Sequence, residues 1–176
     1  MNLSLFYVIL FGGIPVVVSY WQLSQTDSAG LWAGLQGWVF YAWMASMALT
    51  VISYFYLFYM FVWGIDDAMV FEWSGADIEP WLCAIYGLFL GSASQYAFIS
   101  IEDLRERRKS FALTANLWLT ALASILIAAS AIAINGVSDV HDVLSIVAGL
   151  VLAVHHVFFD AIYWLQSFDP EYDQIV

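Results

Sequence analysis

Three ionisable side chains lie deep within a long apolar run near the end of the chain: His155, His156 and Asp160. Ionisable groups inside hydrocarbon are costly to keep there, so they are candidates for function by default. His156 and Asp160 are four residues apart. On an α-helix this spacing places them on one face, which we expect to point into a helix bundle. His155 is turned by about 100° from His156, so we expect it to face another neighbour or the lipid.

Polar side chains in two other apolar segments lie at depths that match this pair. These side chains are Ser92, Gln95, Asn116 and Thr120. Depth is counted inward from the expected cytoplasmic end of each helix. Gln95 and Asn116 then lie level with Asp160, and Ser92 and Thr120 lie level with His156, about one turn deeper. The sequence therefore predicts a polar pocket, shared by three helices, in the cytoplasmic half of the membrane.

An imidazole beside a carboxylate supports more than one kind of chemistry. His156 and Asp160 can exchange a proton, which predicts a proton or ion transporter or channel. They are also ligands for transition metals, which predicts a metal-dependent membrane enzyme. No other helix supplies a further His, Cys or acidic residue at that depth, so a third ligand is lacking and the metal stays unassigned. A hydrogen-bonded pair that only fixes how the helices pack is the remaining alternative.

The aromatic content favours a different function. The chain has nine Trp, and 18% of its residues are aromatic. Aromatic rings can line a pocket for a flat apolar ligand or form belts at the two membrane interfaces. No Walker loop, nucleophile elbow or HExxH motif occurs. Our first functional expectation is therefore a non-enzymatic protein that holds a small apolar ligand, or an accessory subunit of a membrane complex.

The elements that must position these residues are apolar helices. The chain has 176 residues, of which 63% are hydrophobic and 11% are charged, whereas soluble domains carry roughly 25% charged residues. Five runs satisfy the length of roughly 20 apolar residues that a transmembrane helix needs. The runs are residues 3–21, 38–63, 80–101, 111–134 and 143–165. We expect an all-α polytopic membrane bundle, a single domain over 1–176, with the lipid bilayer as its main partner.

Charge predicts the orientation of this bundle. All four basic residues lie within residues 105–109. Short cytoplasmic loops are enriched in Lys and Arg, so we expect this segment in the cytoplasm, the N-terminus outside and the C-terminus inside. Asp103 and Arg107 are at helical spacing, which predicts an ion pair. The net charge of −11 argues against nucleic acid as a partner, because phosphate backbones require clustered cations.

Small residues predict where the helices meet. Helices in lipid pack through small side chains and interhelical hydrogen bonds. Gly87 and Gly91 are four residues apart, and the last run has Ser145, Gly149 and Ala153 at the same spacing. We expect both stripes to face the interior of the bundle.

Five tryptophan-rich spans in a short chain resemble the architecture of the translocator-protein family, whose members bind porphyrins and sterols. The resemblance implies a helical bundle that holds a flat apolar ligand. It extends to the architecture alone, so it assigns no role to any residue of this sequence.

Overall fold

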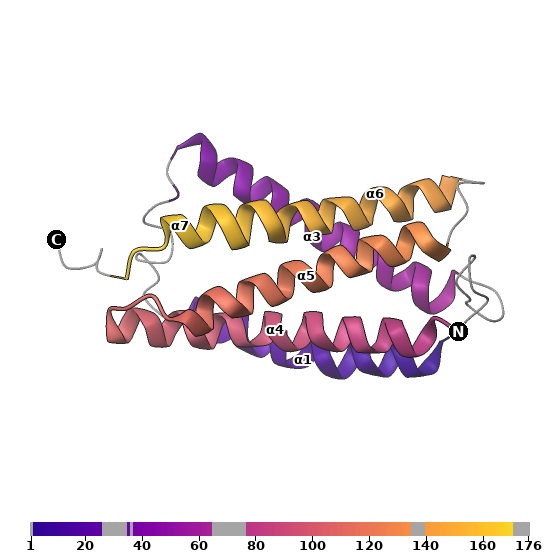
Figure 1. The fold of residues 1–176 in the computed structure, drawn as a ribbon, viewed down its shortest axis with the longest axis horizontal. Coiled ribbons are helices and arrows are strands. Elements are labelled where there is room, and N and C mark those ends of the chain that lie inside the picture. Colours follow the sequence, from indigo (N-terminus) through magenta and orange to yellow (C-terminus); the bar gives the residue numbers. More distant parts are fainter. Residues whose placement is uncertain (1, 26–34, 36, 65–76, 135–139, 171–176) are drawn as a thin grey trace.

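The computed structural model describes residues 2–25, 35, 37–64, 77–134 and 140–170, which fold almost entirely into helices (Figure 1). The elements are α1 (Leu3–Ser24), α3 (Trp38–Trp63), α4 (Glu79–Glu106), α5 (Phe111–Ile134), α6 (Val140–Val154), the π-helix η1 (His155–Trp164) and α7 (Leu165–Ser167). The last three follow one another without a break. The described residues thus contain five helical segments that are long and apolar enough to cross a membrane. The expectation of an all-α structure with about five such helices is confirmed.

The helices lie alongside one another and alternate in direction (Figure 1). α4 packs between α1 and α5, α5 packs against α6, and α6 packs against α3, which crosses it at an angle. The starts of α1, α4 and α6 lie at one end of the bundle, and α7 lies at the other end with the turn at residues 107–110. All four basic residues are therefore at the α7 end.

Local capping determines where the helices begin. The side chain of Asn2 accepts a hydrogen bond from the backbone N–H of Leu5 at 2.9 Å, which satisfies one of the free donors at the start of α1. At the start of α4, the carboxylate of Asp77 accepts from the N–H of Glu79 at 2.9 Å. Pro80 follows in the first turn, where the missing N–H of proline removes no helical hydrogen bond.

A network around Asp103 closes the turn between α4 and α5. Its carboxylate accepts hydrogen bonds from the backbone N–H and the hydroxyl of Ser110, at 2.8 and 2.9 Å. The Ser110 hydroxyl in turn accepts from the N–H of Leu113 at 3.1 Å. Arg107 adopts a left-handed conformation with φ of 52° and reverses the chain. Asp103 therefore caps the turn, and the structure replaces the expected Asp103–Arg107 ion pair with these bonds.

The outer surface of the bundle is apolar. Large side chains are exposed along the helices, among them Val17 on α1 at 70% and Ile52 on α3 at 66%. In water such a surface would favour aggregation, whereas in a bilayer the hydrocarbon chains solvate it. α1 is the least buried of the five segments, because it packs mainly against α4.

The two small-residue stripes have different locations. Gly149 lies against α5, so that a Cβ built on it would be 2.8 Å from the Cα of Ala128. The stripe of the last helix therefore faces a neighbour, as expected. Gly87 and Gly91 are exposed, with no heavy atom near a Cβ built on them. The expectation that they face the interior is wrong, because α1 approaches α4 through its own glycine, Gly12, which lies against Leu90.

This difference between two glycines predicts opposite effects of one substitution. We expect Gly149→Ala to lower the free energy of unfolding by about 1–3 kcal/mol, because the new methyl group meets helix backbone that cannot rotate away. We expect Gly87→Ala to leave it unchanged or raise it by up to about 1 kcal/mol, since Ala is the better helix former. Unfolding of the purified variants by SDS in mixed micelles, followed by circular dichroism, measures both. Equal stability of Gly149→Ala and the wild type would contradict the packing described here.

Candidate functional site

Asp160 is the centre of a hydrogen-bonded group that joins the last helix to α3. One carboxylate oxygen, Oδ1, accepts from the indole N–H of Trp43 at 3.2 Å. The other, Oδ2, lies 3.5 Å from Nε2 of His155. The second ring nitrogen of His155, Nδ1, is 3.0 Å from the hydroxyl of Ser46. His155 and Trp43 are buried, at 3% and 6% exposed, whereas Asp160 and Ser46 at the two ends of this chain of polar groups are half-buried.

The π-helix explains why Asp160 pairs with His155. Residues 155–164 form η1, in which backbone hydrogen bonds join residues five apart instead of four. His155 and Asp160 are five residues apart, and the wider turn aligns them. The expected pair of His156 with Asp160 assumed an α-helix and is not formed. Of the two directions expected for His155, toward the lipid or toward another neighbour, the structure shows the second, and that neighbour is α3.

His156 points to a different side of the last helix. Its Nδ1 is 2.8 Å from the carbonyl oxygen of Leu152. Its ring contacts the ring of Phe89 on α4 edge-to-face, with centroids 5.1 Å apart. The rings of His155 and His156 are themselves 5.2 Å apart. The two adjacent histidines therefore contact different helices, His155 contacting α3 and His156 contacting α4.

Three of the four predicted polar partners form a separate cluster between α4 and α5. The side-chain amide of Asn116 donates to the carbonyl of Ser92 at 3.0 Å. The hydroxyl of Thr120 lies 2.9 Å from that of Ser92 and donates to the carbonyl of Asn116 at 3.0 Å. All three are buried. Gln95 is exposed on α4 and lies outside the cluster, so the predicted pocket of three helices is divided into an α4–α5 cluster and the Asp160 group.

Two tyrosines on other helices interact with the Asp160 group electrostatically. Tyr20 on α1 and Tyr96 on α4 both interact electrostatically with the Asp160 carboxylate. Their rings are 6.4 Å apart, and Tyr96 packs edge-to-face on Trp164 with centroids 5.1 Å apart. Tyr96 thus links α4 to the last helix at Trp164, whereas the direct hydrogen bond to the carboxylate comes from Trp43 on α3.

Sequence reasoning missed most of the partners of Asp160. Trp43 and Ser46 are three residues apart on α3, so they share a face that a search for polar side chains at helical spacing could have found. Tyr20 and Tyr96 give no comparable signal, because their electrostatic interaction with Asp160 follows from the packing of distant segments.

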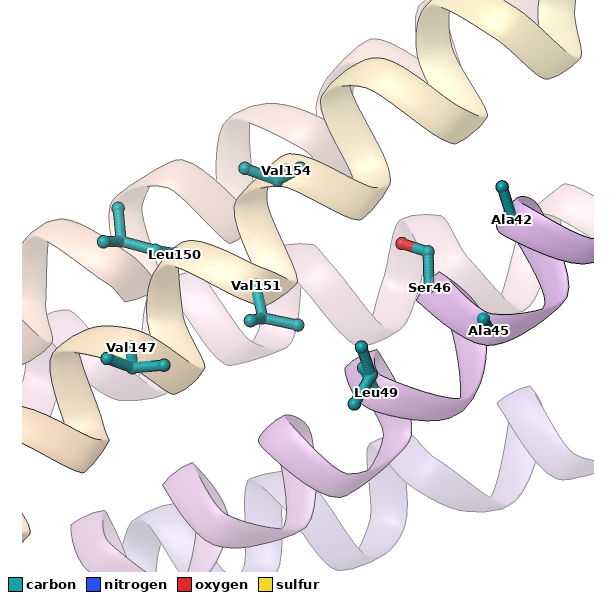
Figure 2. Close-up of a pocket in the computed structure, with 8 residues that line it drawn as sticks. All are labelled: Ala42, Ala45, Ser46, Leu49, Val147, Leu150, Val151 and Val154. Atoms are coloured by element: carbon teal, nitrogen blue, oxygen red, sulfur yellow. The ribbon is translucent and has the colours of Figure 1, made fainter. Parts of the chain in front are cut away.

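A groove between α3 and α6 borders this group on the outside of the bundle. It encloses about 420 Å³ and is lined by Ala42, Ala45, Ser46 and Leu49 from α3 and by Val147, Leu150, Val151 and Val154 from α6. Figure 2 shows the Ser46 hydroxyl as the polar group among these apolar side chains. Because the same hydroxyl contacts His155, the groove and the Asp160 group share one residue.

The metal hypothesis gains no support from this geometry. Among the described residues, no three His, Cys, Asp or Glu side chains come close enough together to hold a metal ion. The two expected ligands, His156 and Asp160, are directed to different partners, Leu152 and Trp43. No protein-family model matches the sequence, and no curated protein or solved structure is significantly similar to it.

The bond between Trp43 and Asp160 predicts an energetic coupling. In a double-mutant cycle of Trp43→Phe and Asp160→Ala, we expect a coupling free energy of about 0.5–2 kcal/mol, the range measured for hydrogen bonds between helices in membranes. SDS unfolding of the four proteins gives this value. The control is Trp38→Phe at the exposed start of the same helix, where 76% of the residue is exposed. If Trp38→Phe and Asp160→Ala gave an equally large coupling free energy, a specific bond between Trp43 and Asp160 would be refuted.

Proposed function

We propose that this protein is an integral membrane protein that transfers protons through Asp160 and His155. The apolar outer surface and the five apolar helices support insertion into a bilayer. The basic segment at residues 105–109 supports a cytoplasmic location for the α7 end and an outside location for the start of α1. In this orientation the Asp160 group lies in the cytoplasmic half of the membrane.

The observation that carries this proposal is a largely buried carboxylate, with 20% of its side chain exposed, whose basic neighbour is a histidine and not a Lys or Arg. A charge inside hydrocarbon must be paired or neutralised. All four Lys and Arg residues of the chain lie at residues 105–109, away from Asp160. Among the described residues, its polar contacts are with a neutral indole and an imidazole. Its charge can therefore be neutralised only by a proton, bound either on the acid itself or on His155, and both sites can release it again.

Ser46 extends this arrangement toward the groove. A hydroxyl both donates and accepts hydrogen bonds, so a proton that leaves Nδ1 of His155 can pass to or from Ser46. The sequence of contacts is then Asp160, His155, Ser46 and the groove between α3 and α6. Each step is short enough for transfer within a hydrogen bond, except the 3.5 Å separation of His155 and Asp160, which must shorten slightly when the proton moves.

Proton flux into liposomes tests the proposal. We expect wild-type protein reconstituted with an internal pH-sensitive dye to dissipate an imposed pH gradient faster than protein-free vesicles do. Asp160→Asn keeps the shape of the side chain but cannot exchange a proton, so its flux should fall to the protein-free rate. Glu102→Gln, at the exposed cytoplasmic end of α4, is the matched control and should behave like the wild type. A flux that Asp160→Asn leaves unchanged would remove this function.

A second candidate function is the binding of a small apolar molecule in the groove between α3 and α6. The groove offers seven apolar side chains and one hydroxyl, the composition typical of sites that bury apolar ligands and orient them by a few polar contacts. A ligand with one hydrogen-bonding group fits this chemistry, with its polar end at Ser46.

Filling the groove tests this second candidate. Ala45→Phe places a ring in the groove, whereas Ala48→Phe places it on an exposed part of the same helix. We expect an organic extract of the purified wild type and of Ala48→Phe to contain a stoichiometric apolar compound by mass spectrometry, and the extract of Ala45→Phe to lack it. Absence of any such compound from all three proteins counts against ligand binding.

A further inference from the structure

We propose that His156 is a second proton acceptor for Asp160, and that the carboxylate moves from His155 to His156 when the π-helix changes to an α-helix. This inference rests on the proton-transfer function proposed above and names the path that the proton takes. It begins from the fact that one acid follows two adjacent histidines, by five residues and by four.

Helix geometry decides which histidine meets the acid. In a π-helix the wider turn aligns residues five apart, and in an α-helix residues four apart lie above one another. The π-helix η1 therefore pairs Asp160 with His155, as the 3.5 Å contact shows. The same segment in α-helical register would pair Asp160 with His156. π-Helical turns are less stable than α-helical ones and occur mostly as single turns, so the α-helical register of the flanking α6 and α7 is an accessible alternative for these ten residues.

His156 is already in the form that accepts a proton. A carbonyl oxygen can only accept hydrogen bonds, so the 2.8 Å contact with Leu152 requires a hydrogen on Nδ1 of His156. The other nitrogen of the neutral ring, Nε2, then carries the free lone pair. Within the described residues no polar atom forms a hydrogen bond with that Nε2. His155, in contrast, uses both of its nitrogens, one with Ser46 and one with Asp160.

The imidazole rings of His155 and His156 contact different helices of the bundle. The ring of His155 lies 5.9 Å from that of Trp43 on α3, next to the groove. The ring of His156 lies 5.1 Å from that of Phe89 on α4, on the side of the buried α4–α5 cluster. Transfer from one histidine to the other would therefore carry a proton across the last helix, from its α3 side to its α4 side.

The proton moves from His155 to His156 through Asp160 in two steps. In the π-helix, the N–H bond at Nε2 of protonated His155 breaks, and an O–H bond forms at Oδ2 of Asp160, which leaves a neutral imidazole and a neutral acid. After the change of register, that O–H bond breaks and an N–H bond forms at Nε2 of His156, which restores the carboxylate. Among the described residues, the hydroxyls of Tyr20 on α1 and Tyr96 on α4 also interact electrostatically with the Asp160 carboxylate.

Substitution of His156 tests the role of the second acceptor. His156→Asn keeps a donor for the Leu152 carbonyl but offers no base, and His156→Phe keeps the ring against Phe89. We expect both variants, reconstituted in liposomes, to lose proton flux to the protein-free rate, although the His155–Asp160 pair is intact. His141→Gln removes the remaining histidine, at the opposite end of the bundle, and should not change the flux.

A spectroscopic measurement separates this role from a structural one. In His141→Gln protein with ¹⁵N-labelled histidine in lipid nanodiscs, we expect the His156 signals at neutral pH to be those of the ring protonated at Nδ1. The pH at which His156 titrates should shift when Asp160 is replaced by Asn. An unchanged titration of His156, or full flux in His156→Asn, would overturn the inference. If Asp160→Asn abolishes flux but His156→Asn does not, the inference fails while the proposed proton transfer stands. If the wild type conducts no protons, both fail.

Discussion

The need to satisfy one carboxylate inside an apolar bundle determines much of this structure. Asp160 has no lysine or arginine within reach, so its two oxygens depend on an indole N–H and an imidazole. Trp43 comes from α3 and so joins that helix to the last one, whereas His155 belongs to the last helix itself and is aligned with Asp160 by the π-helical backbone. Without the acid, the widened turn would lose this side-chain contact, and α3 would lose the hydrogen bond from Trp43 while it keeps the contact between Ser46 and His155.

The remaining helices form a firmer frame around this site. α4 and α5 are joined at one end by the capped turn around Asp103 and farther along by the cluster of Ser92, Asn116 and Thr120. α5 is joined to α6 by the direct contact of Gly149 with Ala128. Helix-to-helix contacts of α3, by comparison, are chiefly with the last helix. The polar site therefore lies at the boundary between a tightly connected unit and a helix with fewer contacts.

The sequence predicts the elements of this fold better than their contacts. Run length and hydropathy are local properties, so five apolar helices could be predicted directly, as could the inward stripe at Gly149. The pairing at Asp160 could not, because 3.6 residues per turn brings together residues four apart, and nothing in the sequence of residues 155–164 indicates a wider turn. Gln95 and Gly87 were placed wrongly for another reason: the exposed side of a helix depends on which neighbours it meets, and that is a property of the whole bundle.

The position of Ser46 connects the buried site to the surrounding membrane. Its hydroxyl contacts His155, and the same residue lines the groove between α3 and α6. A lipid or other molecule that occupied the groove would meet this hydroxyl, and a hydrogen bond to it would compete with the contact that the hydroxyl makes with the imidazole. Bilayer composition would then act on the protein as an effector, without a dedicated receptor domain.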